Sequence, residues 1–140
     1  MKKILVVDDD KNLAELIAEF CRDAGLDTRF LTDSSKAVEL AAEWKPDLIT
    51  LDIEMPGVDG IEVLRRLQGD ERTNRIPVVI ISVVAKGALT EGILKGARMV
   101  FEKPLRFQKL IKQLQDLLSR PAQADAESVH FEPHLRTSAP

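Results

Sequence analysis

The sequence predicts an α/β fold with a parallel sheet between two layers of helices, because apolar runs and amphipathic stretches alternate five times along the chain. Four of the runs are continuously apolar, as is typical of strands buried on both faces. Each of these four stops at a polar residue, namely Asp8, Asp52, Ser82 and Lys103. With 140 residues, of which 44% are hydrophobic, the chain suits one domain with an ordinary core.

The first strand and helix are indicated by a change from a continuously apolar run to apolar residues at helical spacing. The strand is expected at Ile4 to Val7, and the helix is marked by the apolar positions Leu13, Leu16, Ile17 and Phe20. Asp10 is interpreted as the cap or first turn of this helix, and Gly25 stands where a helix ends.

The second unit follows the same pattern. A strand is expected at Leu26 to Leu31, and Asp33 with Ser34 caps the next helix. The apolar positions of that helix extend to Trp44, and Pro46 prevents it from continuing.

The last three units complete the expected sheet. The strands are predicted at Asp47 to Asp52, Ile76 to Ser82 and about Arg98 to Glu102. The helices after them are marked by Ile61, Leu64 and Leu67, by Leu89, Ile93 and Leu94 before Gly96, and by apolar positions from Phe107 to Leu118. The last helix has the clearest amphipathic pattern.

The composition changes after Arg120, where prolines appear and the apolar period stops. Residues 121–140 are therefore expected to form a flexible tail. The spacing of His130 and His134 could hold zinc on a helix, but Pro133 argues against a helix there.

The charge and cysteine content exclude several functions. Lys and Arg number 20 against 23 for Asp and Glu, a net charge of −3, so nothing favours nucleic acid or an anionic membrane as a partner. The single cysteine, Cys21, excludes an internal disulfide framework. No apolar run has the length of a membrane span or of a secretory leader, and we expect a cytoplasmic protein.

The polar residues that follow the strands are expected to meet at the carboxyl edge of the sheet, where open α/β sheets bind ligands. Asp8, Asp9 and Asp52 would bring three carboxylates to this edge, Ser82 a hydroxyl and Lys103 an ammonium group. Such a set suits a divalent cation and a phosphoryl group.

These motifs, taken in this order, resemble the receiver domain of the bacterial response regulators, similar to the chemotaxis response regulator. They are Val6 to Asp10, Leu51 to Gly60, Ile76 to Ser82 and Lys103-Pro104. The resemblance runs from Lys2 to about Ser119. It implies a doubly wound, flavodoxin-like sheet in the order 2-1-3-4-5, with a receiver domain at residues 1–120 and the tail at 121–140.

The resemblance also implies roles for the site residues. Asp52 would be the phosphoacceptor, and Asp8, Asp9 and Asp52 would hold Mg²⁺ together with the backbone carbonyl of Glu54. An anionic nucleophile and an anionic donor repel each other, so a hard cation with oxygen ligands is needed between them.

Lys103 and Ser82 would contact the phosphoryl oxygens, Lys103 with a positive charge and Ser82 with a hydroxyl in place of the more common threonine. The resemblance implies a cis Lys103-Pro104 bond. One position departs from the family pattern, because Val100 stands where an aromatic switch residue is usual.

The function implied is that of a single-domain response regulator in a two-component phosphorelay. A sensor histidine kinase or a phosphotransfer protein would donate the phosphoryl group. A downstream protein effector would bind the face formed by the fourth helix, fifth strand and fifth helix. The chain would assist its own phosphorylation and dephosphorylation without being an enzyme, and no DNA-binding module is expected after residue 120.

An alternative remains open, an Asp-nucleophile phosphatase that depends on Mg²⁺. Glu54, two residues after Asp52, gives a weak resemblance to the D-x-D pattern of those enzymes. The acidic pair Asp8-Asp9 upstream and the lack of a cap domain favour the receiver.

Overall fold

The computed structural model describes residues 1–53, 60–82, 96–119 and 130–131. The strands are β1 (Lys3–Val7), β2 (Asp27–Leu31), β3 (Leu48–Asp52), β4 (Val78–Ser82), β5 (Met99–Glu102) and β6 (His130–Phe131). The helices are α1 (Lys11–Asp23), a 3₁₀ turn (Ser34–Lys36), α2 (Ala37–Trp44), α3 (Gly60–Gly69) and α5 (Phe107–Ser119). The five predicted strands and four of the predicted helices are therefore present; β1 begins one residue earlier than expected, and β2, β3, β4 and β5 begin one or two residues later.

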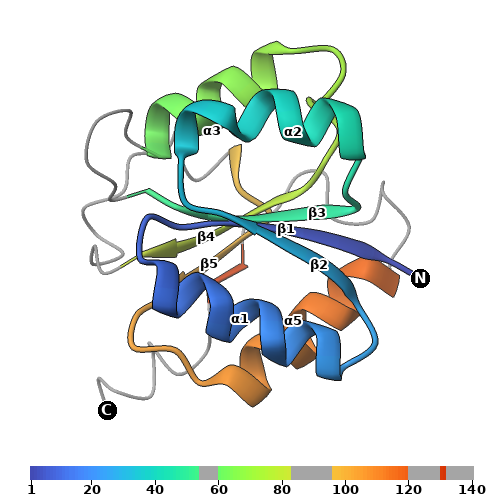
Figure 1. Ribbon diagram of the computed structural model, residues 1–140, viewed down its shortest axis with the longest axis vertical. Coiled ribbons are helices and arrows are strands. Elements are labelled where there is room, and N and C mark those ends of the chain that lie inside the picture. The colour runs from blue at the N-terminus through green and yellow to red at the C-terminus, as the bar shows by residue number, and fades with distance from the viewer. Residues whose placement is uncertain (54–59, 83–95, 120–129, 132–140) are drawn as a thin grey trace.

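The sheet confirms the predicted topology. Its strands are parallel in the order β2-β1-β3-β4-β5, followed by β6. Helices α2 and α3 cover one face, and α1 and α5 cover the other (Figure 1). All five residues of β3 and of β4 are buried, which explains their continuously apolar runs.

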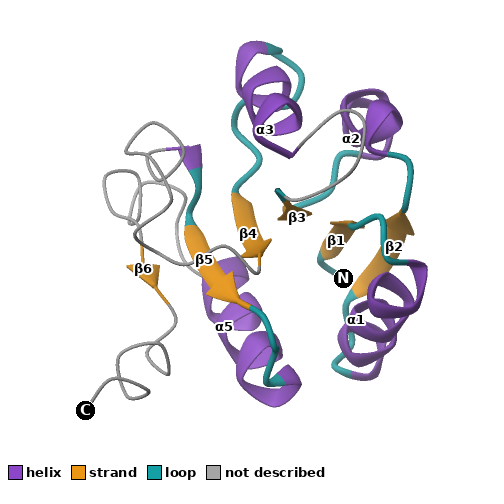
Figure 2. Cartoon of the chain, turned by 90° about the vertical axis from the view of Figure 1, so that its left-hand side faces the viewer, coloured by secondary structure: helices purple, strands orange, loops and turns teal. Residues whose placement is uncertain are grey.

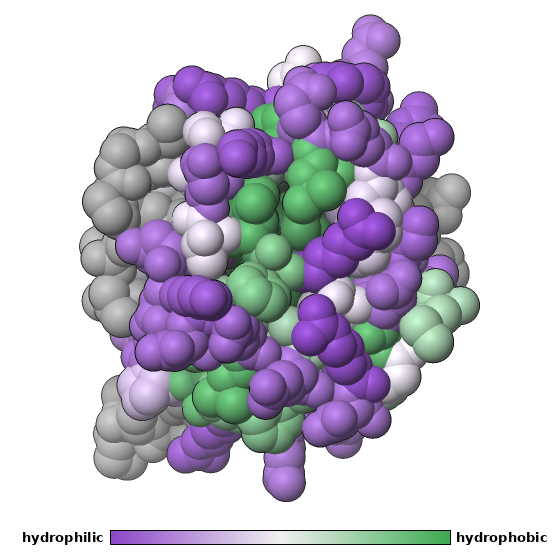
Figure 3. Space-filling view, viewed as in Figure 1, coloured by the Kyte–Doolittle hydropathy of each residue, from purple (hydrophilic) through white to green (hydrophobic). Residues whose placement is uncertain are grey.

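Alternate strand residues divide the core into two halves. Leu5, Ile49 and Ile80 pack toward α2 and α3, whereas Ile4 and Phe101 pack with α1 and α5. Figure 3 shows polar side chains over the helices and an apolar area between the two helical layers. This packing fixes strands β1 to β5 against both layers, so the strand ends that carry polar residues have defined positions.

Local signals explain where the first helix begins and ends. The carboxylate of Asp10 accepts a hydrogen bond from the amide of Leu13 at 3.1 Å, as an N-cap does. Gly25 has a φ of +86°, which terminates α1 as predicted.

The second helix ends as the sequence predicts and differs only at its start. It begins with the 3₁₀ turn, and the Asp33 carboxylate accepts from the amide of Ser35. At its other end α2 stops at Trp44, two residues before Pro46, and its C-cap Lys45 adopts a left-handed conformation with φ 55°.

Two further points concern the predicted tail and fourth helix. The short strand β6, from within residues 121–140, pairs with β5 and was not predicted (Figure 2). The predicted fourth helix lies within residues 83–95, outside the described part of the chain. None of the described helices combines the length and apolarity that a membrane span requires.

Candidate functional site

Two buried carboxylates meet at the carboxyl edge of the sheet. β1 and β3 are neighbours in parallel register, with Val7 opposite Leu51. Asp8 and Asp52, the next residue of each chain segment, therefore lie side by side. Asp8 is 2% exposed and Asp52 is 4% exposed. The amide of Asp10 donates to the Asp8 carboxylate at 2.9 Å, which orients that side chain. Asp10 thus has a second contact, one that its interpretation as a helix cap did not include.

Lys103 bridges the two carboxylates. Its Nζ lies 3.3 Å from Oδ2 of Asp8 and 3.2 Å from Oδ2 of Asp52. The lysine follows β5, and the Lys103-Pro104 bond is cis as the resemblance implied. Residues more than fifty positions apart in the sequence therefore meet at one point, as the strand-end pattern predicted.

Ser82 lies at the same edge, at the end of β4. It is fully buried, and its carbonyl accepts a hydrogen bond from the backbone amide of Lys103 at 2.8 Å. The pairing of β4 with β5 places Ser82 opposite Glu102, the residue before the lysine. The structure thus brings Asp8, Asp52, Ser82 and Lys103 together.

Burial changes the electrostatics of Asp8. The pKa of Asp8 is raised from 3.8 to about 6, mainly by desolvation and also by nearby Asp52, although the Asp10 amide and the Lys103 ammonium act to lower it. For Lys103, burial lowers the pKa, but the two carboxylates outweigh burial and leave it above its usual value. The ammonium group therefore stays protonated, and Asp8 titrates close to neutral pH.

The donor set fits a hard divalent cation. One carboxylate oxygen from each of Asp8, Asp9 and Asp52 lies within 4.8 Å of the other two. Asp9 is exposed, so one side of the group is open to solvent. Three carboxylates and one ammonium carry two surplus negative charges when all are ionised, and carboxylate oxygens are the ligands that Mg²⁺ and Ca²⁺ prefer. The predicted carbonyl ligand, Glu54, lies outside the described residues.

Gly60, the last residue of the Leu51 to Gly60 motif, also supports the site. Gly60 begins α3, and a Cβ at this position would collide with the backbone of Asp52 and Ile53. Its amide donates to the carbonyl of Ile53 at 3.2 Å. Only glycine allows the start of α3 to approach the Asp52 backbone so closely. The signal was present in the sequence as a glycine directly before a helical period.

A family model described as response regulator receiver domain matches residues 4–115. Among curated proteins, the DNA-binding dual master transcriptional regulator RpaA of Synechocystis is 33% identical over 133 residues, which cover 94% of this chain and 55% of that protein. The chain therefore spans about half the length of this relative.

Solved structures agree with the observed fold. The receiver domain of the Francisella response regulator 1452 superposes with a TM-score of 0.77 and 31% identity, covering 86% of this chain and 98% of that chain. The chemotaxis protein CheY4 of Vibrio cholerae gives a TM-score of 0.75 at 26% identity, covering 83% and 98%.

Proposed function

This chain belongs to the response regulator receiver domain family, and from that premise we propose that it accepts a phosphoryl group on Asp52 with the help of Mg²⁺. The observation that carries the proposal is the position of Lys103, whose ammonium group lies within 3.3 Å of both buried carboxylates. A cation held at this place can balance charge on a phosphoryl group beside Asp52.

The proposed transfer uses groups of this chain in distinct roles. A carboxylate oxygen of Asp52 attacks phosphorus, so a new O–P bond forms while the N–P bond of a donor phosphohistidine breaks and its electron pair stays on the imidazole. Lys103 and the hydroxyl of Ser82 contact the phosphoryl oxygens. Asp8, Asp9, Asp52 and the Glu54 carbonyl would hold Mg²⁺, which supplies charge neutralisation between the two anions.

The proposed partners follow from the family. A histidine kinase or a phosphotransfer protein supplies the phosphoryl group, and the proposed setting is the cytoplasm, where ATP is available to such a kinase. The output is a change in affinity for a protein effector at the face formed by the predicted fourth helix, β5 and α5. Val100 on β5 is 2% exposed and packs in the core, so no aromatic side chain is there to move.

The direct test is intact-mass analysis after incubation with acetyl phosphate and Mg²⁺. The protein should gain one phosphoryl group, and both Asp52→Asn and chelation of Mg²⁺ should abolish the gain. Asp27→Asn, the same change at an exposed residue of β2, is the matched control and should be phosphorylated like the unchanged protein.

Phosphorylation that persists in Asp52→Asn would refute the assignment of the acceptor. Release of phosphate from a small ester over many turnovers would instead support the phosphatase alternative.

A further inference from the structure

Strand β2 forms a free edge of the sheet. It pairs with β1 along all five of its residues, and no other strand of the described part of the chain lies on its far side. β2 is nearest the viewer in Figure 1, and Figure 3, in the same view, shows an apolar area between the helical layers. Phe30 and Leu31 of β2 are only partly buried. A free edge of this kind can pair with a strand of another chain.

The hydrogen bonds to β1 identify the backbone groups of β2 that face outward. The amide of Asp27 and the carbonyl of Leu31 bond to residues that flank β1, at 2.8 and 3.1 Å. The register with β1 is continuous between these two residues. Because the peptide groups of alternate residues in a strand point to opposite sides, the amides and carbonyls of Thr28 and Phe30 point away from β1.

One of these outward carbonyls is already occupied by a side chain. Arg22, in the last turn of α1, donates to the carbonyl of Thr28 through Nε at 3.2 Å and through Nη2 at 2.8 Å. Thr28 is buried and Arg22 is exposed, so an exposed guanidinium group covers a backbone group of a buried residue. A strand added at this edge would have to displace Arg22 in order to use that carbonyl.

The charges of β2 favour one antiparallel register with a second copy of the chain. In a two-fold pair centred on Thr28, the two Thr28 residues would exchange both amide–carbonyl hydrogen bonds. Asp27 of each copy would then lie opposite Arg29 of the other, and opposite charges directly across a strand pair stabilise it. A pair centred on Arg29 would place like charges opposite each other. Both registers need the Thr28 carbonyl that Arg22 occupies.

We propose that the β2 edge is an interface for a second copy of this chain, and that Arg22 keeps this edge closed by occupying the carbonyl of Thr28. Pairing of two intact chains would break the bonds from Arg22 to Thr28 in both copies, and this cost disfavours association. Removal of the guanidinium group removes that cost. The proposal does not depend on phosphotransfer, because none of these residues belongs to the site at the carboxyl edge of the sheet.

The test is sedimentation equilibrium of the full chain over a concentration series. Arg22→Met keeps an aliphatic side chain but removes the donors. It should form dimers with a dissociation constant at least about tenfold lower than that of the unchanged protein, because pairing no longer breaks a charged hydrogen bond in each copy. Lys11→Met removes an exposed cation from the same helix and is the matched control. This control should associate no more than the unchanged protein.

Charge variants test the register. Adding Asp27→Arg to Arg22→Met places like charges opposite each other at both ends of the pair, and should weaken association about tenfold. Adding Arg29→Asp as well exchanges the two charges and should restore association. The Arg29 guanidinium lies 4.7 Å from the centroid of the Trp44 ring, so melting curves are needed to show that this last variant folds. If it does not fold, the loss caused by Asp27→Arg still decides the register.

Three results would overturn the proposal. The first is an Arg22→Met protein that remains monomeric throughout the concentration series. The second is a dimer of Arg22→Met that Asp27→Arg leaves unchanged, because the two copies would then meet at another surface. The third is equal association of Arg22→Met and Lys11→Met, which would assign the effect to net charge and not to the Thr28 carbonyl.

Discussion

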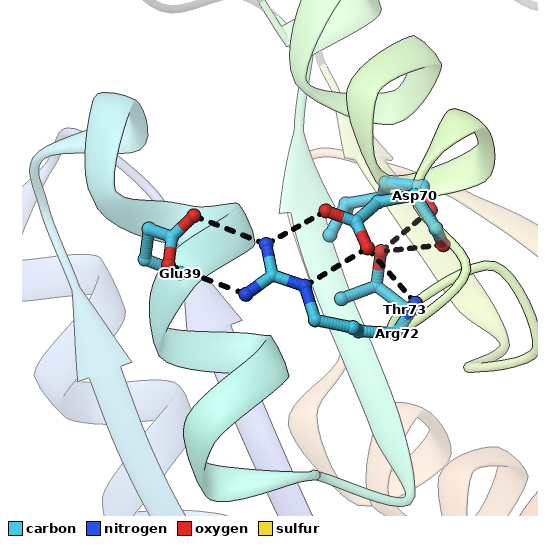
Figure 4. A network of polar contacts seen from close by, with 5 residues as sticks. Glu39, Asp70, Arg72 and Thr73 are labelled. Atoms are coloured by element: carbon cyan, nitrogen blue, oxygen red, sulfur yellow. Dashed lines mark hydrogen bonds and ion pairs between the residues drawn. The ribbon is translucent and has the colours of Figure 1, made fainter.

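Among the described residues, two clusters each place one cation between two carboxylates, and these clusters differ mainly in their access to water. In the site, Lys103 pairs with Asp8 and Asp52, and the three side chains are 17%, 2% and 4% exposed. On the surface, Nη2 of Arg72 lies 3.1 Å from Glu39 and 2.8 Å from Asp70 (Figure 4). The surface side chains are 52%, 67% and 24% exposed.

One carboxyl group in each cluster, Asp8 in the site and Asp70 on the surface, has a shifted pKa, and the two shifts are in opposite directions. Hydrogen bonds from the Arg72 side chain and backbone lower the pKa of Asp70 to about 2. In the site, desolvation dominates and raises the pKa of Asp8 to about 6 although a lysine is present. Similar ion-pair geometry therefore has opposite effects, because water solvates one carboxylate and is largely excluded from the other.

The surface cluster has a structural role. Arg72 joins α2 to the segment after α3 through Glu39 and Asp70. Thr73 beside it is buried, and its hydroxyl donates to the carbonyl of Leu67 at 2.6 Å. These contacts hold the connection between α3 and β4 against α2. The buried cluster, in contrast, retains surplus charge that a ligand can neutralise.

The largest effect is expected when the buried cation is removed. Lys103→Met leaves two buried carboxylates without their counter-charge, and should lower the free energy of unfolding by about 3 kcal/mol at pH 8 without Mg²⁺. The loss should shrink as the pH falls toward 6, because Asp8 becomes protonated, and it does so at a higher pH in this variant since Lys103 lowers the Asp8 pKa. Urea unfolding followed by fluorescence of Trp44, the single tryptophan, measures it.

Arg72→Met is the matched control for that experiment. It removes a cation between two carboxylates that remain solvated, so its cost should be several times smaller and nearly independent of pH between 6 and 8. Equal losses for Lys103→Met and Arg72→Met would show that burial is not what separates the two clusters.

The sequence was sufficient to predict the features that depend on local pattern and strand order. The strand ends gave the positions of Asp8, Asp52, Ser82 and Lys103, because parallel strands share one carboxyl edge. The end of the first helix at Gly25 was also predictable from the sequence, because glycine favours the backbone conformation that terminates helices.

Features that depend on tertiary contacts were not predicted. Sequence analysis placed Asp8 and Asp9 together as ligands, yet only Asp8 is buried. The Arg72 cluster joins residues 33 positions apart on a polar surface, where no sequence pattern indicates which residues form a pair. Strand β6 is only two residues long and has no alternating pattern to identify it.

The next effect concerns the charge of Asp8 itself. The pKa of Asp8 is raised from 3.8 to about 6 in the folded protein, so ionisation of this carboxyl group opposes folding. The favourable contribution of Asp8 to stability is therefore complete below about pH 4 and is lost as the pH rises through 6. Asp8→Asn, which does not titrate, should gain stability relative to the unchanged protein between pH 4 and 7. The upper limit is about 3 kcal/mol, since loss of the Lys103 contact reduces the gain.

Asp9→Asn provides the control, because it removes the same charge from an exposed neighbour. Urea unfolding across pH 4 to 8 should show the pH-dependent gain for Asp8→Asn alone. A gain of the same size in both variants would mean that general charge repulsion, and not burial, is responsible.

Binding of Mg²⁺ should have a smaller effect on stability. This effect should depend on the buried cluster, which has surplus negative charge, and not on the surface cluster. At ten times its dissociation constant the ion should stabilise the protein by about 1.4 kcal/mol, or about 3–8 °C in Tm. Asp8→Asn should abolish the shift, whereas Asp70→Asn, which changes the surface cluster, should retain it. Calorimetric melting curves with and without Mg²⁺ give the result, and an equal shift in Asp8→Asn would exclude Asp8 as a ligand.

The smallest effect is expected within the surface cluster. A double-mutant cycle of Glu39→Gln and Arg72→Met should give a small favourable coupling, corresponding to a few degrees of Tm at most, because both side chains are more than half exposed. At 1 M NaCl the Debye length is about 3 Å, and the coupling should disappear. The cost of Lys103→Met should be reduced much less by the same salt, since its partners are only 2% and 4% exposed. If salt instead reduced both effects in the same proportion, the two clusters would be equally solvated, and the contrast in their pKa shifts would need another cause.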